Sequence, residues 1–269
     1  MKKTTFALVP ADKKSKSSVP AAEKAFDILE LAAESPQGLT MNEIVDALGR
    51  TMGEIYRVVV YLAERGYLHH DAVTNRYSLT LKLFELSHRY DPTDRLIRLA
   101  LPILERIAAR TQQSCHLGVL SRTNVLVLAS VHSPLPAGYS VRTGALFPVK
   151  QTSSGHVILA FSPDDVQIRS VNRFAKGERE KLRKRFAQIR ADGFEDTPSK
   201  MIHGVRNLCV PVFDMRGVVA AITCGFIGQQ DMTVTAEEAL TIIRISALEL
   251  SRELGFRLDS SSFGDVLSK

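Results

Sequence analysis

The sequence lacks any run of about 18 consecutive apolar residues, the length that a membrane-spanning helix needs. Its first residues, MKKTTFALVPADKKSKSS, are basic and hold only a short apolar patch. A secretory signal requires a longer apolar segment. We therefore expect no membrane association, a cytoplasmic protein, and a disordered basic arm over residues 1–17.

Cysteine is also scarce. The three thiols, Cys115, Cys209 and Cys224, stand far apart, and no C-x-x-C or H-x-x-x-H spacing occurs. These absences argue against a zinc site and against a disulfide framework. Buried, reduced thiols are the prediction, and a redox sensor is the less favoured alternative.

Catalytic motifs are missing as well. The chain has no G-x-S-x-G nucleophile elbow, no phosphate-binding glycine loop and no cluster of metal ligands. Cys115 and His116 are neighbours, but adjacent side chains of a strand point to opposite faces. His156 follows an SSG turn and has no evident carboxylate partner in the sequence. We predict that the chain is not an enzyme and uses no cofactor or metal.

Positive charge is in excess, with a formal net charge of +6 and a sequence pI near 9.3. Such a balance favours nucleic acid or acidic partners. Residues 1–16 hold five lysines and one aspartate, a net +4, whereas residues 17–80 hold five basic and nine acidic residues, a net −4. DNA binding by residues 17–80 must therefore depend on where single charges lie.

Three helical patterns follow the basic arm, within residues 18–38, 40–49 and 51–66. The second and third each begin with a T-x-x-E capping box, Thr40 with Glu43 and Thr51 with Glu54. In the third, a buried stripe is predicted, formed by Ile55, Val58, Val59 and Leu62. Two helices joined by a tight turn, the second with a polar outer face, are typical of a helix-turn-helix.

A hairpin is predicted directly after these helices, in YLHHDAVTNRYSL, residues 67–79. It would form the wing of a winged helix-turn-helix spanning residues 18–80. Arg57 and Tyr56 are the first candidates for base contacts, and Gly53 would let the helix front approach a DNA strand. Arg57 in a surface salt bridge is the alternative. The predicted DNA-binding set is Arg50, Thr51, Met52, Gly53, Tyr56, Arg57, Val60, Asn75 and Arg76.

The pattern changes after residues 81–111, which read as linker helices with Pro102 as a kink or a new start. Strands are predicted at residues 115–120, 124–131, 139–149, 207–214 and 217–227, and helices at 153–161, 162–171, 177–193 and 235–256. A sheet with segregated helices indicates an α+β domain over residues 112–257. A polar tail, residues 258–269, completes the chain.

Five segments together resemble the IclR-type family of bacterial transcription regulators. They are residues 18–49, RVVVYLAERGYL, RYSLTLKLFELS, FPVKQTSSGHVILA and GVRNLCVPVFDMRGVVAAIT. The resemblance covers about residues 18–256. It implies a winged helix-turn-helix, a linker helix and a GAF-like effector domain in a homodimer or homotetramer. It also implies a repressor or activator that binds palindromic double-stranded DNA and senses a small metabolite, often an organic acid.

Two segments depart from the family pattern. TMGEIYR stands where the family has a K-S-T-V run, which suggests a different operator. TPSK, residues 197–200, stands where relatives often carry an acidic D-D-E-E stretch, with Thr197 at the position of a carboxylate that contacts the ligand. By the resemblance, the effector cavity would be lined by Val149, Ser153, Ser154, Gly155, Thr197, Val205, Asn207, Thr223 and Gly225.

The predicted helix start at Ser153, Ser154 and Gly155 would favour an anion, because free N–H groups and the positive end of the helix dipole meet there. We expect a carboxylate as the effector. A plain N-cap explains the same serines equally well. A second hypothesis for the whole chain is a DNA-binding protein whose C-terminal domain only oligomerises.

Overall fold

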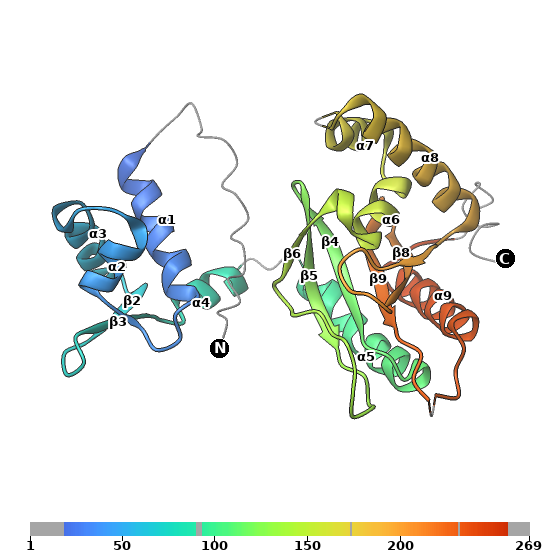
Figure 1. The fold of residues 1–269 in the computed structure, drawn as a ribbon, viewed down its shortest axis with the longest axis horizontal. Helices are drawn as coiled ribbons and strands as arrows, with labels where there is room; N and C mark the ends of the chain where they lie inside the picture. Colours follow the sequence, from blue (N-terminus) through green and yellow to red (C-terminus); the bar gives the residue numbers. More distant parts are fainter. Residues whose placement is uncertain (1–18, 90–92, 173, 231, 258–269) are drawn as a thin grey trace. The chain divides into compact units, whose positions relative to one another are not determined.

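The computed structural model describes residues 19–89, 93–172, 174–230 and 232–257. The chain divides into two compact units near residue 91 (Figure 1). The predicted arm and polar tail lie outside the described residues. Each unit has its own buried core, and each is described by itself below.

The first unit is built on three helices, α1 (Pro20–Ala33), α2 (Met41–Leu48) and α3 (Met52–Glu64). A reciprocal capping box starts α2: the Glu43 N–H donates to Thr40 Oγ1 at 3.3 Å, and the Thr40 N–H donates to the Glu43 carboxylate at 2.8 Å. Gly49 ends α2 with a φ of 60°. The apolar stripes of the three helices meet in one core, formed by Ile28, Ala32, Ile44, Ile55, Val59, Leu62, Leu68 and Tyr77.

A small sheet closes this unit. Its strands β1 (Leu39–Thr40), β2 (Leu68–Asp71) and β3 (Arg76–Leu79) lie in the order β1-β3-β2, all antiparallel. The turn between β2 and β3 is the predicted wing. The helix α4 (Lys82–Arg89) follows it and exposes large apolar side chains, Leu83, Phe84 and Leu86 among them.

The second unit is a six-stranded sheet in the order β6-β5-β4-β9-β8-β7, antiparallel throughout. Its strands are β4 (Cys115–Ser121), β5 (Asn124–Val131), β6 (Leu146–Pro148), β7 (Glu195–Pro198), β8 (Arg206–Asp214) and β9 (Gly217–Phe226). Opposite faces of the central strands supply two separate cores.

Helices cover both faces of this sheet (Figure 1). On one face pack α5 (Asp94–Thr111) and α9 (Ala236–Glu253), whose apolar sides join the larger core. On the other face lies α6 (Ser153–Phe161), introduced by the short 3-10 helix η1 (Val149–Gln151) and followed by α7 (Asp164–Val171) and α8 (Lys176–Asp192). Every residue of α6 is buried.

The structure differs from the predicted elements at the short strand β1, which was not predicted, and in three further places. The strand predicted at 139–149 is reduced to β6, because the chain turns at Gly144, which has a φ of 82°. The edge strand β7 was not predicted, since its sequence EDTP has no apolar alternation. Residues 81–111 are not uniform: α5 runs through Pro102 and belongs to the core of the second unit.

Candidate functional site

The outer face of α3 carries the predicted DNA contacts. Tyr56 and Met52 are 53% and 43% exposed, Arg57 is exposed, and Val60 is half-buried. Arg57 has no hydrogen bond or ion pair with any described residue, whereas Ile55 and Val59 of the same helix are fully buried. Its guanidinium is therefore available to a partner outside the chain.

The front of α3 is open. A Cβ added at Gly53 would meet no atom within 4 Å, so packing inside the protein does not require a glycine there. The residue leaves the first N–H groups of the helix uncovered, which allows another backbone or a phosphate to come close.

Glu54 is engaged at this helix front. Its Oε2 accepts hydrogen bonds from the Thr51 N–H at 3.0 Å and from the Thr51 hydroxyl at 2.9 Å, and its Oε1 lies 3.1 Å from Lys24 Nζ. The hydrogen bond from the Thr51 backbone is the main cause that lowers the pKa of Glu54 to about 2, and Lys24 adds to it. The carboxylate is thus held as a cap, as the sequence predicted.

The other predicted contacts have partners inside the protein. Arg76 donates from Nη1 and Nη2 to the two oxygens of the Glu43 carboxylate, at 3.0 and 3.3 Å. Its Nη1 also donates to the Gly38 carbonyl oxygen at 2.8 Å. Asn75, with a φ of 54°, accepts a hydrogen bond from His70 Nε2 at 2.9 Å. Arg50 Nη2 lies 3.7 Å from Asp27 Oδ2. A phosphate contact by Arg76 stays a prediction, and it would compete with an existing ion pair.

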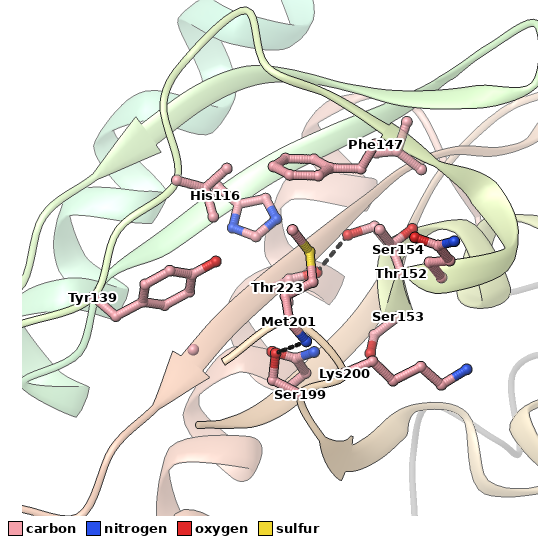
Figure 2. Close-up of a pocket in the computed structure, with 15 residues that line it drawn as sticks. His116, Tyr139, Phe147, Thr152, Ser153, Ser154, Ser199, Lys200, Met201 and Thr223 are labelled. Carbon is pink, nitrogen blue, oxygen red and sulfur yellow. Dashed lines mark hydrogen bonds between the residues drawn. The ribbon is translucent and has the colours of Figure 1, made fainter. Parts of the chain in front are cut away.

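A cavity lies in the second unit between the start of α6 and the sheet (Figure 2). Its volume is about 40 Å³, the room of a few water molecules at most. The lining comes from β4, β5, β6, β8, β9, the η1–α6 corner and two loops. The lining residues are His116, Val125, Tyr139, Val141, Phe147, Gln151, Thr152, Ser153, Ser154, Ser199, Lys200, Met201, Asn207, Thr223 and Gly225.

Hydrogen bonds tie the floor of this cavity together. Ser154 Oγ and Thr223 Oγ1 are 2.8 Å apart, and the Thr223 hydroxyl lies 3.1 Å from the Cys209 sulfur. Cys209 is fully buried, and burial raises the pKa of its thiol, which therefore stays neutral. All three cysteines are free and buried, as predicted.

The lining contains one cation and no carboxylate. Lys200 is exposed at the cavity, at the end of the TPSK segment, residues 197–200. His116 faces the same space, and burial lowers the pKa of its imidazole to about 4. At neutral pH this ring is uncharged, so it offers one donor and one acceptor.

Five of the nine predicted effector residues line the cavity: Ser153, Ser154, Asn207, Thr223 and Gly225. Val149, Thr197, Val205 and Gly155 do not. An ideal Cβ at Gly155 would lie only 2.4 Å from the Val149 carbonyl oxygen. The absent side chain therefore permits close packing of α6 on η1, and it does not add room for a ligand.

Ten of the fifteen lining residues were not in the predicted set, His116, Tyr139 and Lys200 among them. His116 could have been found, because it pairs directly with Thr223 across β4 and β9. The same row continues through Cys209 on β8 to Glu195 on β7, so polar side chains cross the sheet beneath α6. Tyr139 and Lys200 lie in loops, where no periodicity reveals which way a side chain points.

Two family models match the chain. The one described as "Bacterial transcriptional regulator IclR C-terminal" matches residues 90–252, more than half of the chain. The chain belongs to the IclR family. The model described as "IclR helix-turn-helix domain" matches residues 21–72. Family membership and the predicted fold class are thereby confirmed: a helix-turn-helix DNA-binding domain precedes an effector-binding C-terminal domain.

Known members of the family resemble the chain over most of its length. It is 27% identical over 252 residues to the HTH-type transcriptional regulator KdgR of Escherichia coli K12, covering 90% of this chain and 95% of the relative. The regulator BhcR of Paracoccus denitrificans is 28% identical, with coverage of 88% and 86%. The crystal structure of an IclR homolog from Microbacterium hydrocarbonoxydans, complexed with 4-hydroxybenzoate, has a TM-score of 0.72, 22% identity and coverage of 87% and 98%, and so shares the fold.

Among the described residues, no helix is both long and apolar enough to cross a membrane. Within the same ranges, no three histidine, cysteine or acidic side chains gather in a way that could hold a metal ion.

Proposed function

We propose that this member of the IclR family binds a palindromic operator through α3 and its wing. We further propose that binding of a small carboxylate raises or lowers its affinity for that operator. The observation that supports the DNA half is Arg57, an exposed guanidinium without an intramolecular partner in the described chain. It stands beside Tyr56 on the face opposite the buried stripe of a helix-turn-helix. Arginine on such a face forms bidentate pairs with guanine.

The other DNA contacts would position the protein rather than specify sequence. Thr51, Met52 and Gly53 lie at the front of α3, where backbone N–H groups can meet a phosphate. Arg50 would contact the backbone from the turn, and Asn75 from the wing. Arg76 would join them only if it leaves Glu43.

The effector half is supported by the charges around the cavity. Lys200 is one of the lining residues, the lining contains no carboxylate, and the N–H groups of Ser153 and Ser154 begin α6 there. Both features favour an anion. Tyr139 and Phe147 would pack on an apolar part of the ligand, and Asn207 and Thr223 would donate hydrogen bonds. This arrangement favours an organic acid over a neutral or cationic metabolite.

The size of the cavity sets a further requirement. A volume of about 40 Å³ is too small for an acid of several carbon atoms. Binding must therefore move part of the lining, and the Ser199–Met201 segment is the best placed, because Lys200 and Met201 are exposed. Such a movement would couple effector binding to a change of shape in this domain.

A homodimer or homotetramer is part of the proposal. Two copies of a winged helix read a palindrome when their symmetry matches that of the DNA. The exposed apolar side chains of α4, Leu83 and Leu86 with Leu81 just before it, would contribute to such a contact.

A screen in two stages tests the effector. Melting temperature is measured with small organic acids, 4-hydroxybenzoate among them, and each hit is added to gel shifts with an operator selected from random double-stranded DNA. We expect a stabilising acid that changes operator affinity, and K200M to weaken its effect while K184M, on the exposed side of α8, does not. If no acid changes either quantity, the alternative of a purely oligomerising C-terminal domain is preferred.

A further inference from the structure

A buried ionic network lies behind the effector cavity, on the side of α6 that faces β7 and α8. Its members are His156 on α6, Glu195 on β7 and Arg185 on α8. His156 is 2% exposed and Glu195 is 5% exposed. Charged groups are rarely buried to this degree unless they are paired, so this arrangement calls for a reason.

Both ring nitrogens of His156 face hydrogen-bond acceptors. Nδ1 lies 3.2 and 3.3 Å from the two carboxylate oxygens of Glu195, and Nε2 lies 3.0 Å from the Lys150 carbonyl oxygen. A carbonyl oxygen can only accept, and so can an ionised carboxylate. Both contacts are hydrogen bonds only when both nitrogens carry hydrogen, as they do in an imidazolium.

Arg185 keeps the carboxylate ionised. Its Nε donates to Oε1 of Glu195, the same oxygen that His156 contacts. Burial raises the pKa of Glu195, but the hydrogen bonds and charges of His156 and Arg185 outweigh that effect and hold the pKa below its ordinary value. A proton shared toward Glu195 would leave Arg185 beside a neutral acid.

Other ionisable groups near the His156 ring do not take the place of Glu195 as its partner. The Lys150 ammonium lies over the Phe174 ring at 5.2 Å and 3.8 Å from Glu178, so it points away from the imidazole. The Cys209 thiol, on β8 beside Glu195, is neutral because burial raises its pKa. Phe186 of α8 covers the imidazole at a ring distance of 6.4 Å.

The ring of His156 contacts the corner where α6 begins. Its Nε2 bond holds η1, and its own backbone N–H donates to the Thr152 carbonyl at 3.1 Å. The Thr152 hydroxyl in turn accepts from the Gly155 N–H at 3.2 Å. Ser153 and Ser154, which line the cavity, lie inside this loop of hydrogen bonds.

We propose that the imidazolium of His156, held by Glu195 and Arg185, is a positioning residue of the effector cavity. Without one of its two ring hydrogens, His156 could no longer donate to both the Lys150 carbonyl and the Glu195 carboxylate. One of these acceptors would lose its hydrogen bond, and the segment from Lys150 to His156 would become more mobile. The affinity of the cavity for an acid would then fall. That last consequence rests on the proposed function, whereas the protonation state and the rigidity of the corner do not.

Nuclear magnetic resonance of the histidine ring nitrogens in the full chain tests the protonation state directly. We expect one histidine with both nitrogens protonated at pH 6.5, and we expect its signals to be absent from H156Q and unchanged in H203Q, which removes an exposed histidine of the same domain. In E195Q the same ring should become neutral. A neutral His156 tautomer in the wild type at pH 6.5 would overturn the proposal without any variant.

Amide hydrogen exchange tests the positioning role. In H156Q and E195Q, residues 150–156 should exchange about tenfold faster than in the wild type, the effect of one lost buried hydrogen bond, while α9 is unchanged. H203Q should follow the wild type. Equal protection in H156Q and wild type would refute the role. Neither readout uses an effector, so a failed effector search does not bear on it.

Discussion

Replacing Arg57 by alanine should reduce sequence-specific DNA binding while leaving the protein folded. The side chain has no partner among the described residues and points away from the core of the first unit. Its removal therefore costs the free protein almost nothing. The whole effect should appear when the protein meets DNA.

The size of the effect follows from the contact that is lost. A bidentate arginine–guanine pair contributes about 1–3 kcal/mol of discrimination against a wrong base. That range corresponds to a loss of about 5- to 150-fold in operator affinity. R57K keeps the charge but loses the planar fork, so it should restore the salt dependence of binding and not the sequence preference.

Fluorescence anisotropy at several salt concentrations separates these contributions, with the selected operator and a scrambled duplex as the two DNAs. R65A is the matched control, because it removes a guanidinium at the end of α3 that is already bonded to the Tyr61 hydroxyl. If R57A changes affinity for both duplexes equally, Arg57 contacts phosphate alone. If R57A changes the affinity for neither duplex, Arg57 does not contact DNA, and its assignment as the base-contacting residue of α3 is wrong.

Three further substitutions test other contacts. E54A should lower the stability of the protein without changing its base preference. Because the pKa of Glu54 is lowered from 4.5 to about 2, the stabilising effect of the carboxylate is full above pH 4.5 and is lost as the pH falls toward 2. Urea unfolding at several pH values measures this loss. S154L should abolish calorimetric binding of an acid found by the screen but leave effector-free DNA binding intact, and wild-type affinity would place the ligand elsewhere. G155A should lose about 1–3 kcal/mol of unfolding free energy through its clash with Val149, whereas G177A, with open space around its Cβ, should gain roughly 0.5–1 kcal/mol.

Local signals made the first unit predictable. A capping box acts over three residues, so Thr40 with Glu43 and the cap by Glu54 could be deduced from spacing alone. Each buried residue of α3 recurs at helical spacing, which also identified the outward position of Arg57. The same reasoning failed for Arg76, because its partner Glu43 is 33 residues away.

The cavity was less predictable for the same reason. Ser153, Ser154 and Thr223 stand in regular elements whose faces follow from periodicity, whereas Tyr139 and Lys200 reach the cavity from loops. The His156–Glu195 pair also escaped prediction, since it depends on β7, an edge strand without an apolar pattern. Contacts between segments far apart in sequence leave no trace in the spacing of residues.

The polar row beneath α6 has a consequence for how the sheet assembles. His116, Thr223, Cys209 and Glu195 lie side by side on four neighbouring strands. A slip of β9 by one residue would carry Thr223 into the apolar core under α5 and α9, where Cys224 now lies. Each such misalignment would bury a hydroxyl, an imidazole or a carboxylate among aliphatic side chains. The row therefore discriminates against wrong alignments during folding, an effect that a uniformly apolar face would not have.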